Sequence, residues 1–174
     1  MINMPSAGTP RYADASPYPP VCVCVPNPAY ARAMLSNMGS SNSEMGAVSL
    51  YFYNSLVTQS PYEEISQCFH QISMVEMHHL EIFGKLALQL GADPRLWSWQ
   101  NQRRIYWSPG YNQYPRELKA LLTNAIAGEK AAIQKYQCQA ESIQDPHIVA
   151  NLNRIILDEE RHVEIMTGLM EQYT

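Results

Sequence analysis

The chain has 174 residues, which is enough for one domain with a substantial buried core. Hydrophobic residues make up 46% of it and charged residues 16%, a composition that argues against a disordered chain. The formal net charge of -4 argues against a nucleic-acid partner. No apolar run approaches the roughly 20 residues of a membrane-spanning helix, so no membrane association is expected.

The N-terminal segment and the cysteines bear on the cellular compartment. Residues 1–16 lack a basic start followed by an apolar stretch, so they do not predict a signal peptide, and we expect a cytoplasmic protein. One residue separates Cys22 from Cys24, which is not the C-x-x-C spacing of a metal knuckle. Cys68 and Cys138 stand alone, and all four cysteines are expected to be reduced.

Proline sets the first part of the chain apart. Seven of the 12 prolines lie within residues 1–28. Proline removes a backbone donor and fixes φ, so this segment cannot be a helix or a central strand. We expect a proline-rich arm over residues 1–28, with residues 21–25 extended along the rest of the protein, and one domain over residues 29–174.

Four long helices are expected after the arm. Two of their ends have clear signals, since Gly91 suits a helix stop and Asp145–Pro146 suits an N-cap with a first-turn proline. Pro115 is a suitable first-turn residue for the third helix. The helices are expected at about residues 29–58, 61–90, 115–142 and 145–171.

The connections between these helices predict the fold class. The first two helices are joined by a tight turn, as are the last two, whereas residues 92–114 form a long connection that contains all three tryptophans. Two antiparallel helix pairs joined by one long crossover are typical of ferritin-like proteins. We therefore predict an all-α, ferritin-like four-helix bundle with the crossover between helices two and three.

Two helices carry a glutamate and a histidine three residues apart on the face expected to point inward. On the fourth helix, Glu159 and His162 interrupt an apolar stripe with steps of three or four residues, and on the second helix Glu76 and His79 do the same. The other two helices each offer one inward glutamate. Because burying unpaired charge is very costly, the pattern predicts a di-metal carboxylate site. The expected ligands are Glu44, Glu76, His79, Glu129, Glu159 and His162.

Charge balance supports two metal ions in this site. Two divalent cations cancel the charge of four buried carboxylates, and neutral imidazoles add none. Iron and manganese are the expected metals, either two iron ions or two manganese ions per chain. Carboxylate and imidazole ligands also accept zinc, so the residue types alone do not choose the metal.

Other polar residues are placed around the expected ligands. Asp158 is expected to accept the ring N–H of His79, as partners of metal-bound histidines usually do, and His162 must find another partner. Tyr51 and Tyr136 lie two turns after Glu44 and Glu129, so each is either a catalytic neighbour of the metals or a plain core residue. The other three histidines, His70, His78 and His147, are expected to lie outside the site.

Over about residues 29–173, the order of ligands resembles the ferritin-like superfamily. Residues 125–129, with the sequence AIAGE, are similar to the third-helix motif of rubrerythrins. The Asn27–Pro28 start and the polar residues 39–43 look more like manganese catalases and their spore-coat relatives. The resemblance implies that Glu76 bridges the ions, with Glu129 as a second candidate, and that Glu44 and Glu159 are terminal ligands.

Two departures separate this chain from rubrerythrins. Rubrerythrins typically carry a further glutamate where this chain has Ala132, and they usually carry a rubredoxin domain for electron delivery, which is not found here. The remaining pattern is also that of manganese catalases, in which the fourth-helix glutamate can sit off the metal as a base. Glu159 would take that role here.

The leading functional hypothesis is an oxidoreductase that acts on hydrogen peroxide or dioxygen, with an electron-donor protein as a further partner. One alternative is a ferroxidase or iron-handling protein, and another is a structural coat or shell protein with a structural metal site. A homodimer or larger assembly is expected, because the crossover would otherwise leave an apolar patch. The large residues of that crossover are Leu96, Trp97, Trp99, Ile105, Tyr106, Trp107, Tyr111 and Tyr114.

Overall fold

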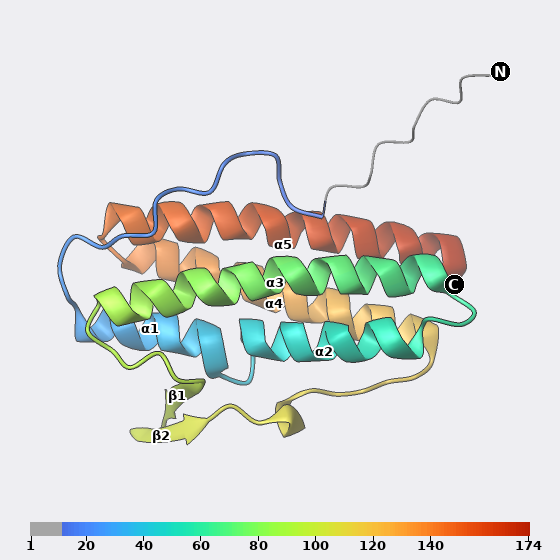
Figure 1. Ribbon diagram of the computed structural model, residues 1–174, viewed down its shortest axis with the longest axis horizontal. Helices are drawn as coiled ribbons and strands as arrows, with labels where there is room; N and C mark the ends of the chain where they lie inside the picture. The colour runs from blue at the N-terminus through green and yellow to red at the C-terminus, as the bar shows by residue number, and fades with distance from the viewer. Residues whose placement is uncertain (1–11) are drawn as a thin grey trace.

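The computed structural model describes residues 12–174, so the first 11 residues of the predicted arm lie outside the described part. Its helices form a bundle in which α1 and α2 together take the place of one long helix (Figure 1). This is the predicted all-α four-helix bundle. The helices of residues 12–174 are α1 Pro28–Gly39, α2 Glu44–Val57, α3 Glu63–Gln89, α4 Leu118–Ser142 and α5 Pro146–Tyr173.

The expectation of one continuous helix over residues 29–58 is wrong, because the chain leaves the helix between α1 and α2. Serine and asparagine side chains dominate this break, and they compete with helical hydrogen bonds. Ser43 starts the second segment as its N-cap, and Lys135 Nζ donates to the last-turn carbonyl of Ser36 at 3.0 Å. The restart places Glu44 in the first turn of α2.

The other helix ends follow from local chemistry. Asp145 caps α5 by accepting from the amide of His147 at 3.0 Å, and Pro146 occupies the first turn, as predicted. Gly91 has a φ of 91°, the left-handed conformation of a helix stop. The helix α4 begins at Leu118 rather than near Pro115, because the Glu117 carboxylate caps it.

The crossover between α3 and α4 contains a small hairpin and one turn of 3-10 helix. Its strands are β1 Trp97–Gln100 and β2 Arg103–Tyr106, paired antiparallel, and η1 spans Pro109–Tyr111. The crossover runs along α1 and α2, whereas the arm runs on the α5 side of the bundle (Figure 1). The two longest non-helical segments therefore lie on opposite sides.

Apolar side chains fill the bundle on both sides of a polar middle layer. One cluster includes Phe83, Leu86 and Ile155, and the other includes Phe69 and Met166. Because the Glu-x-x-His pairs fall between these residues on α3 and α5, the polar layer is enclosed at both ends. Within residues 12–174, no helix combines the length and apolar character needed to cross a bilayer.

Candidate metal centre

The predicted ligands meet in the middle of the bundle. They come from α2, α3, α4 and α5, and all are buried, with relative exposures of 0–2%. Their donor atoms form two groups that overlap, each suited to one metal ion. The first group is Glu44, Glu76, His79 and Glu159, and the second is Glu76, Glu129, Glu159 and His162.

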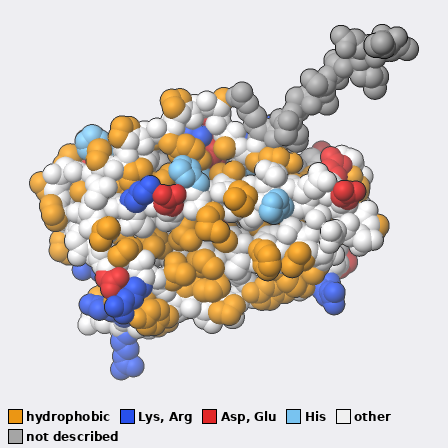
Figure 2. Space-filling view, in the orientation of Figure 1, with side chains coloured by type: hydrophobic (Ala, Val, Ile, Leu, Met, Phe, Trp, Pro, Cys, Tyr) orange, Lys and Arg blue, Asp and Glu red, His pale blue; other side chains and the backbone are white. Residues whose placement is uncertain are grey.

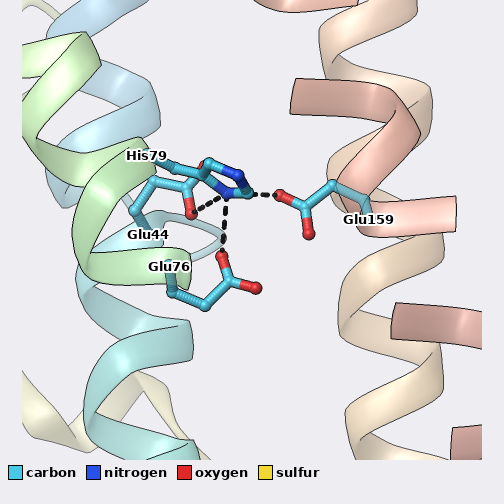
Figure 3. Close-up of side chains that lie close together, drawn as sticks. All are labelled: Glu44, Glu76, His79 and Glu159. Atoms are coloured by element: carbon cyan, nitrogen blue, oxygen red, sulfur yellow. Dashed lines mark hydrogen bonds and ion pairs between the residues drawn. The ribbon is translucent and has the colours of Figure 1, made fainter. Parts of the chain in front are cut away.

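The first group surrounds the Nδ1 atom of His79. The carboxylate oxygens of Glu76 and Glu159 lie 3.3 Å and 3.4 Å from this nitrogen, and that of Glu44 lies at 3.8 Å. Figure 3 shows the three carboxylates converging on the ring from three different helices. Three carboxylate oxygens and one imidazole nitrogen are donors that iron and manganese both accept.

The second group repeats this arrangement around the Nδ1 atom of His162. Glu76 lies at 2.9 Å, Glu159 at 3.1 Å and Glu129 at 3.5 Å from it. Glu76 and Glu159 thus belong to both groups. Glu129 belongs to one group only, so this grouping places Glu159, expected as a terminal ligand, beside Glu76 between the two groups, and the bridging roles themselves stay a prediction.

The pKa shifts of the buried groups reflect a layer that holds more carboxylates than imidazoles. Burial and the neighbouring carboxylates raise the pKa values of Glu44 and Glu129 well above the usual range. Burial has the same effect on Glu76, but His162 and His79 outweigh it and hold its pKa well below the usual value. Burial opposes charging of both imidazoles, yet the surrounding carboxylates raise their pKa values.

One contact tests whether a metal fits. The Nε2 atom of His162 lies 2.9 Å from the carbonyl oxygen of Tyr12, which can only accept, so the ring proton belongs on Nε2. In the neutral ring, the lone pair of Nδ1 then faces Glu76 Oε1 at 2.9 Å, and this oxygen has no hydrogen-bond donor in the described chain. Two facing lone pairs require a cation between them, either a proton on Nδ1 or a metal ion, and the carboxylate and imidazole donors gathered here suit a metal ion.

The outward nitrogens of both histidines have partners. Asp158 Oδ2 lies 2.9 Å from His79 Nε2, the contact anticipated from the sequence. Burial raises the pKa of this carboxyl, but hydrogen bonds from His79, Arg154 and Tyr18 lower it to about 2. Asp158 is therefore ionised at neutral pH and accepts the ring proton of His79.

Two tyrosines touch the carboxylates that belong to one group each. The hydroxyl of Tyr51 donates to Glu129 Oε1 at 2.6 Å, and that of Tyr136 donates to Glu44 Oε1. Burial and the nearby carboxylates raise the pKa values of both phenols well above 10. At neutral pH both are protonated donors beside the predicted ligands.

A cavity of about 80 Å³ opens onto the same carboxylates from the α2–α4 side. It has room for a molecule of two oxygen atoms, because one water takes up about 30 Å³ in the liquid. At its rim the crossover meets α2, where Asn112 Nδ2 donates to the carbonyl of Gly46 at 3.0 Å. Its wall includes the small residues Gly46, Ala47, Ala125, Gly128 and Ala132.

The remaining histidines lie outside the centre, as expected. His70 and His147 are exposed, and the side chain of His78 is 45% exposed and stacks edge-on against Tyr18. Cys22, Cys24, Cys68 and Cys138 are all free thiols. None of these residues belongs to either ligand group.

The contacts of the arm with the site could not be predicted from the sequence. Tyr12 contacts His162 through its backbone, which no side-chain pattern can indicate. Tyr18 binds Asp158 from 140 residues away. Arg154 is different, since it lies one helical turn before Asp158 and forms a buried ion pair with it at 2.6 Å, so the i, i+4 spacing was a usable signal.

Solved structures with the same fold include a manganese catalase, a bacterioferritin and a thioferritin. The manganese catalase KatB from Anabaena has a TM-score of 0.81 at 20% identity, covering 91% of this chain and 78% of that chain. The bacterioferritin BfrA of Mycobacterium tuberculosis scores 0.68 at 21% identity, covering 85% of this chain and 87% of its own. The dodecameric thioferritin from Bacteroides fragilis has a TM-score of 0.68 at 17% identity, covering 84% of this chain and 88% of that chain.

At these identities the structural likeness shows the fold, and it confirms the predicted ferritin-like bundle. No curated protein matches the sequence. The family itself is shown by the sequence. The rubrerythrin family matches residues 39–170, which is most of the chain, and this protein therefore belongs to the rubrerythrin family.

Proposed function

We propose that this protein is a di-metal oxidoreductase that acts on hydrogen peroxide or dioxygen. The observation that carries the proposal is the pairing of two overlapping ligand groups with a small cavity that reaches Glu44, Glu129 and both tyrosines. Two iron or two manganese ions, bound by these groups, would exchange electrons with the substrate. Glu76 and Glu159 would contact both ions, and His79 and His162 one each.

The chain's own residues would manage the protons. Tyr51 and Tyr136 are protonated at neutral pH, and their hydroxyls donate hydrogen bonds to Glu129 and Glu44. Each pair is a path along which a proton can move. In disproportionation, one peroxide is reduced to two waters and a second is oxidised to dioxygen, and the protons released by the second are used by the first. A carboxylate–phenol pair on each side of the cavity can store these protons between the two halves.

Disproportionation is favoured over a rubrerythrin-type peroxidase cycle. Ala132, which occupies the position of the additional rubrerythrin glutamate, lines the cavity instead of filling it with a carboxylate. A peroxidase reaction would also require an external reductant, for which an electron-donor protein is the expected class. The manganese catalase KatB has a similar fold, which agrees with this preference.

The test is to load separate samples with iron and with manganese, then to follow peroxide and dioxygen with and without a reductant. The expected result is peroxide loss well above that of the free ions, with dioxygen released in the absence of reductant. Glu159→Ala should slow this reaction strongly, whereas Glu160→Ala, on the exposed face of the same helix, should leave it unchanged.

Ferroxidase activity is the second candidate, because the same ligand chemistry serves it and the bacterioferritin BfrA shares the fold. Ferrous ion would then be the substrate. Fast ferrous oxidation without peroxide turnover would favour this alternative. If both activities are missing from protein that carries metal, the structural coat or shell role is the remaining explanation.

A homodimer or larger assembly is part of the proposal. Phe52, Leu56, Met74 and Met77 are 49–61% exposed on α2 and α3, and Figure 2 shows apolar surface gathered over these helices. Trp99, on the crossover, is 44% exposed. Apolar surface of this kind is normally covered. Sedimentation should give a dimer or larger species, and a monomer at high concentration would contradict it.

A cytoplasmic location remains a prediction from the sequence.

A further inference from the structure

The described part of the arm is tied along α5 by polar contacts. Near its end the amide of Cys24 donates to Asp145 at 2.6 Å. Closer to the site, Arg154 donates from Nε to the carbonyl of Ser16 at 2.8 Å and from Nη2 to that of Asp14 at 3.0 Å. The arm therefore follows the helix with a fixed register, which Figure 1 shows as a chain running over α5.

Three of the arm's contacts reach the candidate metal centre. The hydroxyl of Tyr18 donates to Asp158 Oδ2 at 2.6 Å, and the amide of Asp14 donates to Asp158 Oδ1 at 2.7 Å. The carbonyl of Tyr12 lies 2.9 Å from His162 Nε2. The outward nitrogen of each histidine is thus bound either by the arm itself or by a carboxylate that the arm holds in place.

These contacts determine which nitrogen of each neutral ring is free. A carbonyl and a carboxylate oxygen both accept, so the rings of His162 and His79 place their proton on Nε2. The lone pair of Nδ1 then points into the ligand groups, where the carboxylates of Glu76 and Glu159 lie. A ring with the opposite tautomer would offer an N–H to the metal and could not bind it.

We propose that residues 12–18 form a strap that fixes the tautomer and orientation of both histidines and so slows the loss of the bound metals. The inference rests on the proposed di-metal site. It assigns a positioning role to Tyr18 and Arg154, neither of which would touch a metal. Both residues act through Asp158, and Arg154 also holds the strap whose Tyr12 carbonyl binds His162.

The polar contacts of the strap indicate that it does more than shield the site from solvent. Asp158 is fully buried and Arg154 is 5% exposed, and desolvating such an ion pair is expensive compared with an apolar contact of similar size. Asp158 nevertheless accepts hydrogen bonds from Tyr18, Asp14 and His79, and it forms an ion pair with Arg154. Four contacts on one carboxylate lock its position, which is what orienting His79 requires.

The first experiment uses Tyr18→Phe in the full chain, with Tyr106→Phe as the matched control. Tyr106 also loses one hydroxyl hydrogen bond, to Arg95, but on the exposed hairpin. Removing the hydrogen-bond partner of a metal-bound histidine costs about 10–100-fold in metal affinity. Tyr18 contacts that partner, Asp158, and not the histidine, so we expect a smaller effect, about threefold to tenfold faster release of manganese to a chelator. The control should release metal at the wild-type rate.

A double-mutant cycle then separates positioning from general stability. Asp158→Asn should itself speed release by about tenfold or more. In that background, Tyr18→Phe should have no further effect, because its action passes through the carboxylate. Purely additive effects of the two changes would overturn the positioning role of Tyr18. Circular dichroism of each variant verifies that the bundle is intact.

Loosening the strap should disturb both histidines. Arg154→Gln removes the donors to the carbonyls of Asp14 and Ser16, and it should speed metal release by about tenfold. Nitrogen-15 spectra of zinc-loaded wild-type protein should show both site histidines with Nε2 protonated and Nδ1 bound to metal, and Arg154→Gln should broaden or shift these signals. Signals from the opposite tautomer in the wild type would overturn the inference.

The outcomes distinguish this inference from the proposed function. If the wild type takes up no metal at these residues, the di-metal proposal fails. If the wild type holds metal while Tyr18→Phe and Arg154→Gln release it at the wild-type rate, the strap has no positioning role and the di-metal proposal stands.

Discussion

The two sides of the candidate metal centre differ in what covers them. On the histidine side, the arm and Asp158 close the site with direct hydrogen bonds. On the opposite side, Glu44 and Glu129 face a small cavity whose wall includes two glycines and three alanines, with Tyr51 and Tyr136 as donors. The crossover lies over this second side.

With different cover on its two sides, one buried site can both retain metals and admit a substrate. Fixed ligands with saturated hydrogen bonds favour retention, and they are concentrated at the histidines. Small side chains leave room next to carboxylates that can change protonation, and they are concentrated at the cavity. Changes on the two sides should therefore affect different measurements, metal binding on one side and turnover on the other.

The largest effect is expected for a ligand shared by both groups. Glu76→Ala removes a carboxylate that lies 2.9 Å from His162 and 3.3 Å from His79, so binding of both ions should weaken by more than about 100-fold. Elemental analysis and calorimetric titration measure this. Glu160→Ala serves as the control, and equal metal content in the two variants would refute the ligand assignment.

Filling the cavity should stop the substrate without removing the metals. In Ala132→Leu, the larger side chain occupies space beside Glu44 and Glu129, and peroxide turnover should fall by about tenfold or more, the scale on which small displacements near a reacting centre act. Metal content should stay at the wild-type level. Ala131→Leu, at the exposed neighbouring position, is the control. Turnover unaffected by Ala132→Leu would show that substrate arrives elsewhere.

Removing a phenol hydroxyl should have a smaller effect that is confined to turnover. Tyr136→Phe deletes the donor to Glu44, and we expect a loss of about tenfold in the peroxide reaction, less than the roughly 100-fold or more of a missing general acid, because the Glu44 carboxylate remains. Metal affinity should change little, in contrast to Tyr18→Phe on the strap side. Stopped-flow peroxide assays measure turnover and chelator competition measures metal retention. Tyr136→Phe should lower mainly the first and Tyr18→Phe mainly the second.

The smallest effect concerns the pH dependence of the metal-free protein. Glu44, Glu129, His79 and His162 all have raised pKa values, so the folded state binds more protons than the unfolded state, and stability should fall as pH rises from about 5 to 8. Glu76, whose pKa is lowered, is ionised in both the folded and the unfolded state over most of this range, so it affects stability mainly below about pH 5.

Thermal melts at several pH values, with and without metal, measure how the stability of the protein changes with pH. The gain from added metal should grow over the same pH range, because protons compete with the metal at low pH. In Glu129→Gln, the metal-free protein should be about 1–2 kcal/mol more stable at pH 7.5. A metal-free wild type that becomes more stable between pH 5 and 8 would contradict the account.

Much of the fold and the candidate site followed from periodicity. The apolar stripes on α3 and α5 carry Glu76, His79, Glu159 and His162 at positions that must face the core, so their convergence could be predicted from helix geometry alone. The crossover was evident from the spacing of the helices. The contact of Asp158 with His79 followed from its place beside Glu159.

Other features depend on distant contacts, side-chain conformations and backbone atoms, which the periodicity of the sequence does not indicate. The serine-rich turn after α1 is held by Lys135, about 95 residues away, which donates to two of its carbonyls and one hydroxyl. The sharing of Glu159 between both groups depends on side-chain conformations, not on helical position. The bond from His162 to the carbonyl of Tyr12 involves a backbone atom, which every residue type possesses.

The most direct measurement is anomalous scattering from crystals of the protein supplied with iron and manganese. We expect two peaks per chain, one beside Glu44 and His79 and one beside Glu129 and His162, with Glu76 and Glu159 next to both. Data collected at the absorption edges of both elements would also identify the metal at each position. No peak among these six side chains, or a single peak outside them, would contradict the central claim that this layer is a di-metal site.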